Sequence, residues 1–193
     1  MARPVLILIS GAPATGKTVL ARRLAEALPV PVIERDAIKE TLFDNLGVGD
    51  RAWSKKLGAA SFALFYLTVE TILTAGRSVI AEAAFHRPYS TRWLSRVRER
   101  FDVEILELHC HADSATALRR YLNRTGTADR HAGHDAGMSI EAQAREWRRQ
   151  YPVYGPLTDG AELFMIDTTD FAAMEHQAIV ARVRAALNLS AGC

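Results

Sequence analysis

The stretch VLILISGAPATGKT, residues 5–18, decides the fold of this chain. Its first five residues are apolar and predict a buried strand, while residues 11–18 match the pattern G-x-x-x-x-G-K-[ST] in full. A helix-like segment follows at once. A strand, a glycine-rich turn and a helix N-terminus together form a cradle of backbone N–H groups for phosphate. The stretch therefore predicts a nucleoside triphosphate site, and this setting disfavours the alternative of a chance glycine-rich turn.

The residues of this loop are the expected nucleotide ligands: Gly11, Ala12, Pro13, Ala14, Thr15, Gly16, Lys17 and Thr18. We expect Lys17 to reach the β- and γ-phosphates, because its ammonium group follows directly on the turn. We expect the Thr18 hydroxyl to help hold Mg²⁺, a cation that prefers oxygen ligands. The loop thus predicts both a donor nucleotide and its metal ion.

The composition bounds the class of protein. A chain of 193 residues, 49% hydrophobic and 24% charged, predicts a single globular domain over residues 1–193. The net charge of +2 is too small to indicate a nucleic-acid partner, which stays possible but is not favoured. The two cysteines have no metal-ligand spacing, and the longest apolar stretches fall short of a membrane span. We expect a cytoplasmic monomer or homodimer that has no membrane partner.

Apolar runs alternate with helix-length segments along the chain. The predicted strands are 5–9, 30–33, 78–81, 103–108 and 163–166. The predicted helices are 18–28, 36–46, 52–75, 89–100, 114–124, 139–150 and 171–187. This alternation favours a five-stranded parallel sheet covered by helices on both faces, a three-layer α/β/α sandwich. Ligands of such sheets bind beyond the carboxyl ends of the strands, so residues that follow strands are the candidates for chemistry.

Residues 119–138 are predicted to form a helical lid within this domain. The segment 125–137 holds three glycines, two histidines and no bulky apolar residue, so it belongs to the surface rather than the core. Arg124 and Arg130 are the candidates to stabilise charge on a transferring phosphoryl group. Arg120, on the preceding helix, is a candidate nucleotide contact. Solvated helix charges are the alternative reading of such arginines.

Polar residues that follow the second and third strands predict the acceptor side of the site. Asp36 could accept the proton of an attacking hydroxyl, or could cap the next helix. Lys39 is either a ligand for an anionic part of the acceptor or a solvated surface lysine. Glu82 lies near Mg²⁺ or near the substrate, two roles that the sequence does not separate. His86 and Arg87 follow at the same edge as candidate acceptor contacts.

The last predicted strand leads to Thr168, at the same edge of the sheet. Its neighbourhood could contact the base of the nucleotide through backbone groups, or could simply form a turn and a helix cap. The long predicted helix 52–75 is a core element by its pattern, and its N-terminal part with Trp53 could also line an acceptor pocket.

Five segments, taken in order, resemble the small P-loop kinase group: 11–18, 35–39, 79–82, the arginine-bearing lid and 166–168. That group includes chloramphenicol phosphotransferase, zeta-toxin-like kinases, the kinase domain of polynucleotide kinases, and gluconate and shikimate kinases. The resemblance covers nearly the whole chain. It implies the P-loop NTPase fold and transfer of the γ-phosphoryl group of ATP to a hydroxyl, with Mg²⁺ and a closing lid. Asp36 matches the carboxylate that acts as the base in two branches, whereas Glu82 replaces the usual aspartate.

The sequence therefore predicts an ATP-dependent kinase whose acceptor is a hydroxyl of a small molecule, such as an antibiotic, a sugar or a nucleoside-like compound. Two alternatives stay open: a polynucleotide 5′-hydroxyl kinase, and a nucleotide-dependent regulatory ATPase that acts on a partner protein. The near-neutral charge favours the small molecule over the polynucleotide. The arginine-rich lid favours an enclosed acceptor over a partner protein.

Overall fold

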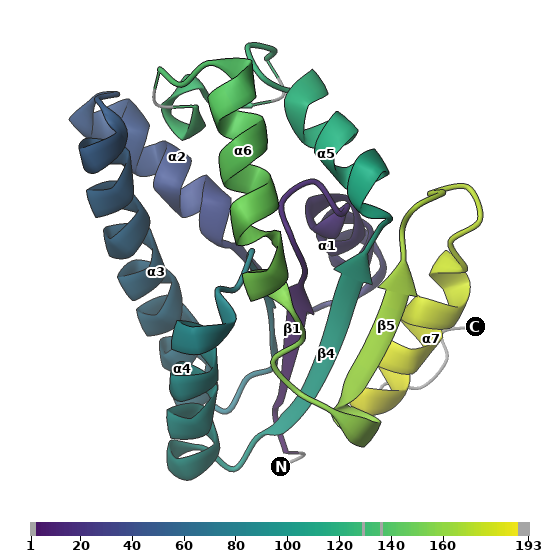
Figure 1. Ribbon diagram of the computed structural model, residues 1–193. Helices are drawn as coiled ribbons and strands as arrows, with labels where there is room; N and C mark the ends of the chain where they lie inside the picture. Colours follow the sequence, from purple (N-terminus) through teal and green to yellow (C-terminus); the bar gives the residue numbers. More distant parts are fainter. Residues whose placement is uncertain (1–2, 129, 136, 189–193) are drawn as a thin grey trace.

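Five strands form one parallel sheet in a computed structural model that describes residues 3–128, 130–135 and 137–188 (Figure 1). The strands are β1 (Val5–Ser10), β2 (Val32–Glu34), β3 (Val79–Glu82), β4 (Glu104–His111) and β5 (Leu163–Asp167). Their order across the sheet is β2-β3-β1-β4-β5, and every neighbouring pair is parallel. The predicted fold class is confirmed.

Seven α-helices and three short 3₁₀ helices are found among the described residues. The α-helices are α1 (Lys17–Ala27), α2 (Arg35–Leu46), α3 (Arg51–Thr74), α4 (Arg87–Arg100), α5 (Ser114–Asn123), α6 (Ile140–Gln150) and α7 (His176–Ala186). The 3₁₀ helices are η1 (Ala132–His134), η2 (Tyr151–Tyr154) and η3 (Gly160–Glu162). Each predicted helix is present. The bounds differ most for α7, which begins at His176 and not at the predicted residue 171.

The late start of α7 has a local cause. Asp167 accepts a hydrogen bond from the backbone N–H of Thr169 at 2.8 Å, and Asp170 accepts one from that of Ala172 at 2.9 Å. Such side-chain turns offer the backbone an alternative to helical hydrogen bonds. They hold Phe171 in a bend rather than in the helix.

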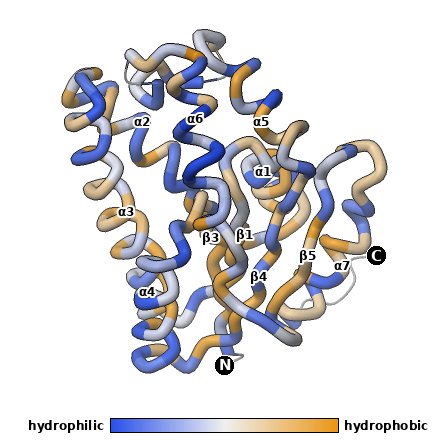
Figure 2. Tube along the Cα trace, in the orientation of Figure 1, coloured by the Kyte–Doolittle hydropathy of each residue, from blue (hydrophilic) through white to orange (hydrophobic). Residues whose placement is uncertain are grey.

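Two hydrophobic layers fix the helices to the sheet, one on each face. On one face, β1 contributes Val5, Ile7 and Ile9 to a core shared with α1 and α7. On the other face, its alternate residues Leu6 and Leu8 join a core shared with α3 and α4. Both sets are fully buried, which explains why the strand reads as a continuous apolar run (Figure 2). The fold is the predicted three-layer sandwich.

Helix α3 is long and apolar enough to cross a membrane when judged by length and composition alone. One such helix is weak evidence of a membrane span, because a core helix of a globular protein passes the same test. Its inner side packs on the sheet through buried residues that include Phe65, Val69 and Leu73. The structure thus gives this helix a role as one outer layer of the sandwich.

The carboxyl ends of the strands gather the predicted site residues at one edge. Glu82 at the end of β3 lies beside Ile9 of β1 and Glu34 of β2 in the strand register. Helix α2 starts directly after β2, which brings Asp36 to this edge, and the phosphate loop follows β1. In Figure 1, α5 and α6 stand above the same edge. The topology therefore places the donor loop, the two acidic residues and the lid together.

Candidate active site

The phosphate loop has a backbone that only small residues allow. Gly11 has φ +129° and Gly16 has φ +83°, both in the region that disfavours side chains. A Cβ atom at Gly11 would lie 2.1 Å from the carbonyl oxygen of Cys110, and one at Gly16 would lie 2.4 Å from the Phe171 ring. The two glycines of the motif are therefore required by sterics, and the loop between them forms a cradle that a side chain would fill.

Lys17 and Thr15 close this loop on itself. The ammonium group of Lys17 donates to the carbonyl oxygen of Ala12 at 2.8 Å, and the Thr15 hydroxyl donates to the same oxygen at 2.8 Å. Lys17 is only 6% exposed. Its charge therefore lies inside the cradle, where an anionic phosphate is a stronger partner than a neutral carbonyl.

Thr18 and Glu82 form the pair that fits a metal ion. The Thr18 hydroxyl lies 3.4 Å from a carboxylate oxygen of the buried Glu82. Burial raises the pKa of Glu82 to about 7, with Asp36 adding to the rise and Lys17 opposing it. A hydroxyl and a carboxylate beside a phosphate cradle are the oxygen ligands that Mg²⁺ takes together with phosphate and water. Within the described ranges, no group of three or more His, Cys, Asp or Glu side chains is arranged for a metal.

Arg120 and Thr168, both predicted to contact the nucleotide, lie together next to the loop. The guanidinium group of Arg120 donates to the carbonyl oxygens of Thr168 and Thr169 at 2.8 and 2.9 Å and stacks 4.4 Å over the Phe171 ring. The Thr168 hydroxyl lies 2.8 Å from the carbonyl oxygen of Thr15. Phe171 was missed in the sequence because the pattern placed it inside a helix. The stacked Arg120–Phe171 pair lies directly against Gly16 of the phosphate loop.

Asp36 lies in the first turn of α2 but does not cap it. The N-cap residue is Glu34, and no side chain accepts a hydrogen bond in that position. The Asp36 carboxylate instead accepts from the Arg35 guanidinium at 2.8 Å. Burial opposes ionisation, but Arg35, His134 and Lys17 outweigh it and hold the pKa of Asp36 well below its usual value. The structure thus favours an ionised Asp36 over the helix-cap alternative.

A cavity of about 800 Å³ lies between α2, α3, the start of α4 and the lid. Lys39 and His86 line it, as predicted for acceptor contacts. Lys39 is only 9% exposed, so the alternative of a solvated surface lysine was wrong. Arg87 is exposed and lies beside Gly155 rather than among the lining residues that the structure describes. Helix α3 forms a wall of the cavity, but its Trp53 is not among the described lining residues. The Trp53 indole N–H donates to the carbonyl oxygen of Gly47.

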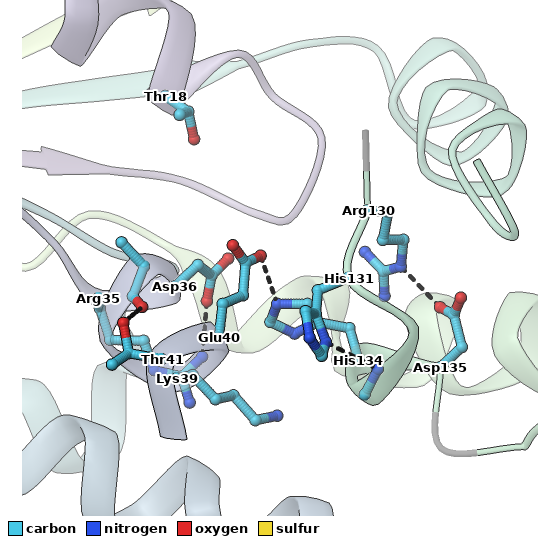
Figure 3. Close-up of polar contacts among 12 residues, drawn as sticks. Thr18, Arg35, Asp36, Lys39, Glu40, Thr41, Arg130, His131, His134 and Asp135 are labelled. Carbon is cyan, nitrogen blue, oxygen red and sulfur yellow. Dashed lines mark hydrogen bonds and ion pairs between the residues drawn. The ribbon is translucent and has the colours of Figure 1, made fainter. Parts of the chain in front are cut away.

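Arg130 is held within the lid. Its guanidinium group forms an ion pair with Asp135 at 2.6 Å (Figure 3). The same group stacks 4.6 Å from the centre of the Tyr121 ring. Arg124 ends α5, and its carbonyl oxygen accepts hydrogen bonds from Thr127. Arg130 therefore contacts Tyr121, a lining residue of the cavity, without itself being one of the described lining residues, and the catalytic role of both arginines stays a prediction.

The tip of the lid, η1, is docked on α2. His131 lies 3.1 Å from the Asp44 carboxylate. His134 lies 2.9 Å from the Glu40 carboxylate (Figure 3). Gly133 packs so closely on the Phe43 ring that a Cβ atom would lie 2.5 Å from it. The predicted lid segment thus contributes Tyr121, His134 and Met138 to the lining of the cavity.

A buried polar network is centred on β4, and no sequence pattern indicated it. The Glu107 carboxylate is fully buried and accepts hydrogen bonds from the Ser10 hydroxyl, from the backbone N–H of Leu157 at 2.9 Å and from that of Thr158 at 2.7 Å. The Ser10 hydroxyl also lies 2.8 Å from a ring nitrogen of His109. The network fixes Ser10, the residue that precedes the phosphate loop.

The fold and the phosphate loop together define a nucleotide-binding protein of the P-loop kinase class. A model of the AAA domain family (AAA_33) matches residues 6–152, and the chain belongs to this family. The predicted resemblance to small P-loop kinases is confirmed.

Solved structures agree with this assignment. A provisionally assigned kinase from Chloroflexus aurantiacus is 34% identical, with a TM-score of 0.85 over 95% of this chain and 98% of that one. A gluconokinase from Sinorhizobium meliloti is 16% identical, with a TM-score of 0.53 over 97% and 94%. A shikimate kinase from Bacteroides thetaiotaomicron is 17% identical, with a TM-score of 0.51 over 96% and 99%. The last two share the fold alone. No curated protein matches this sequence.

Proposed function

We propose that this protein transfers the γ-phosphoryl group of ATP, with Mg²⁺, to a hydroxyl group of a small molecule. The observation that carries the proposal is the cavity of about 800 Å³ that Arg35 lines, because the Arg35 guanidinium group also donates to the Asp36 carboxylate at 2.8 Å. The charge of Lys17 acts on Asp36 and on Glu82, so the donor loop and the acceptor side are electrostatically coupled. A cavity of this volume has the size of small-molecule sites.

On the donor side, the loop amides and Lys17 would bind the triphosphate, while Thr18 with Glu82 would hold Mg²⁺. ATP and Mg²⁺ supply the phosphoryl group and neutralise the charge that develops on it. Arg120 with Phe171 would orient the nucleobase, since both already lie beside Gly16.

On the acceptor side, Asp36 would accept a hydrogen bond from the attacking hydroxyl. Because the pKa of Asp36 is lowered, its carboxylate is a weak base, and its main contribution is orientation of the hydroxyl. Phosphoryl transfer needs little more, since positioning and charge stabilisation carry most of the rate. Residues 119–138 would act as the lid within one domain, and Arg124 and Arg130 would stabilise the transferring group once Arg130 leaves Asp135.

The decisive test is a screen for product followed by two variants. The protein would be incubated with ATP–Mg²⁺ and a panel of sugars, hydroxy acids, nucleosides and antibiotics, and mass spectrometry would detect an added phosphate. With the acceptor found, Lys17→Ala should abolish turnover, because nothing else in the cradle carries its charge. Asp36→Asn should lower kcat at least about 100-fold while the Kd for ATP changes less than about threefold.

The exposed Asp102→Asn variant is the matched control and should behave as the wild type. Wild-type turnover by Asp36→Asn would refute the role of Asp36. ATP hydrolysis without any phosphorylated product across the panel would instead favour the regulatory ATPase. A steep salt dependence of acceptor binding would favour the polynucleotide.

A further inference from the structure

The charge of the acceptor cavity is one-sided. Of the described residues that line it, four are cationic, namely Arg35, Lys39, Arg51 and Lys55, and only Glu146 is a carboxylate. The remaining lining is largely aromatic and apolar, with rings from α3, α4 and the lid. Cations collected in a concave, partly apolar site attract an anion more strongly than they would in water.

The single carboxylate of the lining does not neutralise the deeper cations. Glu146 forms an ion pair with Arg51 at 2.5 Å and another with Arg149 at 2.8 Å. It also accepts a hydrogen bond from Gln150. The Glu146 carboxylate therefore interacts with Arg51, Arg149 and Gln150 and not with Lys39.

Lys39 is a buried cation for which the described residues supply no ion-pair partner. Its ammonium group donates to the Ser54 hydroxyl at 3.1 Å and lies 5.1 Å from the centre of the Phe43 ring. Across the described part of the chain, no carboxylate lies within ion-pair distance of it. Buried charges are normally paired, because an unpaired one loses its hydration without compensation.

Two further polar atoms of the lining have no hydrogen-bond partner. Arg35 uses its two terminal nitrogens on Asp36 and on the carbonyl oxygen of Gly58, but its Nε is buried and unpaired. Ring nitrogen Nδ1 of His86 is likewise buried and unpaired. Both residues line the cavity. Buried polar atoms without a partner are rare in native proteins, and here two of them belong to residues that line one cavity.

We propose that the acceptor is an anionic alcohol, a molecule that carries a carboxylate or phosphate group besides the hydroxyl that receives the phosphoryl group. Lys39 and the other cations of the lining bind the anionic group, and the hydroxyl lies at Asp36. The assignment rests on the proposed kinase function and adds the chemical class of its acceptor. Lys39 follows Asp36 by one helical turn, so the anion and the hydroxyl contact one side of α2.

The test uses matched pairs of acceptors with the full chain and ATP–Mg²⁺. One arm compares hydroxy carboxylates with their carboxamides, and a second arm compares sugar phosphates with the free sugars, each read by mass spectrometry and steady-state kinetics. The charged member of at least one arm should be preferred about 100-fold in kcat/KM. Equal or better turnover of the neutral members would overturn this inference and leave the kinase function standing. Turnover of none, in either arm or in the wider panel, would overturn both.

A variant at Lys39 tests the residue itself. Lys39→Met should raise KM for the charged acceptor about 10- to 100-fold, with kcat within about threefold, and should leave KM for its neutral counterpart unchanged. Lys39→Arg should restore much of the affinity, because it keeps the charge. Lys56→Met, an exposed lysine of α3 outside the cavity lining, is the control. An equal effect of Lys39→Met on both members of a pair would show a structural role and overturn the assignment.

Discussion

At the scale of residues, two carboxylates at one edge of the sheet have opposite environments. Glu82 is buried, and this burial raises its pKa to about 7, whereas Arg35, His134 and Lys17 lower the pKa of Asp36, whose side chain is largely exposed. Pairs of acidic groups whose pKa values are pushed apart often have different roles. In the proposed kinase, Asp36 would be ionised and would accept a hydrogen bond from the acceptor hydroxyl, whereas Glu82 would lose its proton when Mg²⁺ binds beside it.

Glu107 offers a stability test at the same scale. Burial opposes its ionisation, but hydrogen bonds from His109, Ser10, Leu157 and Thr158 lower its pKa below the ordinary 4.5. A lowered folded-state pKa stabilises the fold above that ordinary value, and this contribution is lost as the pH falls through the folded-state pKa. Glu107→Gln should therefore cost about 2–3 kcal/mol of unfolding free energy at pH 7.

Urea unfolding of both proteins measures this difference. The gap between wild type and Glu107→Gln should shrink as the pH falls below about 4.5, since wild-type Glu107 then becomes neutral as well. Glu104→Gln, at the exposed start of the same strand, should change little at either pH. A gap that stays constant with pH would contradict the ionised state of Glu107.

At the scale of elements, the lid reaches the acceptor side through the short helix η1. Ser54 of α3 donates to the carbonyl oxygen of Gly133 at 3.1 Å, and Phe43 of α2 packs beneath the same glycine. Burial lowers the pKa of His134, although Asp36 and Glu40 nearby raise it. Gly133 thus sets how closely the lid approaches α2 and α3.

Gly133→Ala should open this contact. The new methyl group would overlap the buried Phe43 ring, so the tip of the lid should move away from α2 and weaken the closed cavity. KM for the acceptor should rise about 10-fold, while the Kd for ATP changes less than about threefold. Steady-state kinetics and nucleotide titration check this, with the exposed Ala132→Ser as control. Equal losses for both ligands would show a general folding defect instead.

The sequence predicted the elements better than the contacts between them. Strand β1 could be predicted because its run of apolar residues and the adjoining loop motif are local signals in the sequence. The position of Asp36 at the edge of the sheet could be predicted because the residue comes soon after a predicted strand. Phe171 could not, since its position depends on turns made by Asp167 and Asp170. The unpaired Nε of Arg35 likewise depends on α3, which supplies the carbonyl oxygen of Gly58 from 23 residues away.

At the scale of the whole molecule, the nucleotide site joins both ends of the chain. The Thr168 hydroxyl lies 2.8 Å from the carbonyl oxygen of Thr15 and 2.8 Å from that of His111, so β5 supports the phosphate loop across β4. Arg120 and Phe171 extend this support to the other side of Gly16. The loop is held by residues far from its own motif.

Thr168→Val should therefore act on nucleotide binding without touching phosphate. The substitution keeps the shape of the side chain but removes a buried hydroxyl, which should cost about 1–2 kcal/mol of stability and raise the Kd for ATP several-fold. Thermal unfolding and nucleotide titration measure the two effects, and the exposed Thr68→Val serves as control. An unchanged Kd for ATP would show that the loop holds its shape alone.

The bond between Thr168 and Thr15 spans 153 positions of the chain. During synthesis, which runs from the N-terminus, the motif that binds nucleotide therefore emerges well before Thr168, which supports it. A chain that stops before Thr168 carries the complete motif without this support. Such a chain should bind nucleotide more weakly, so the ligand should stabilise it less than a chain that includes Thr168.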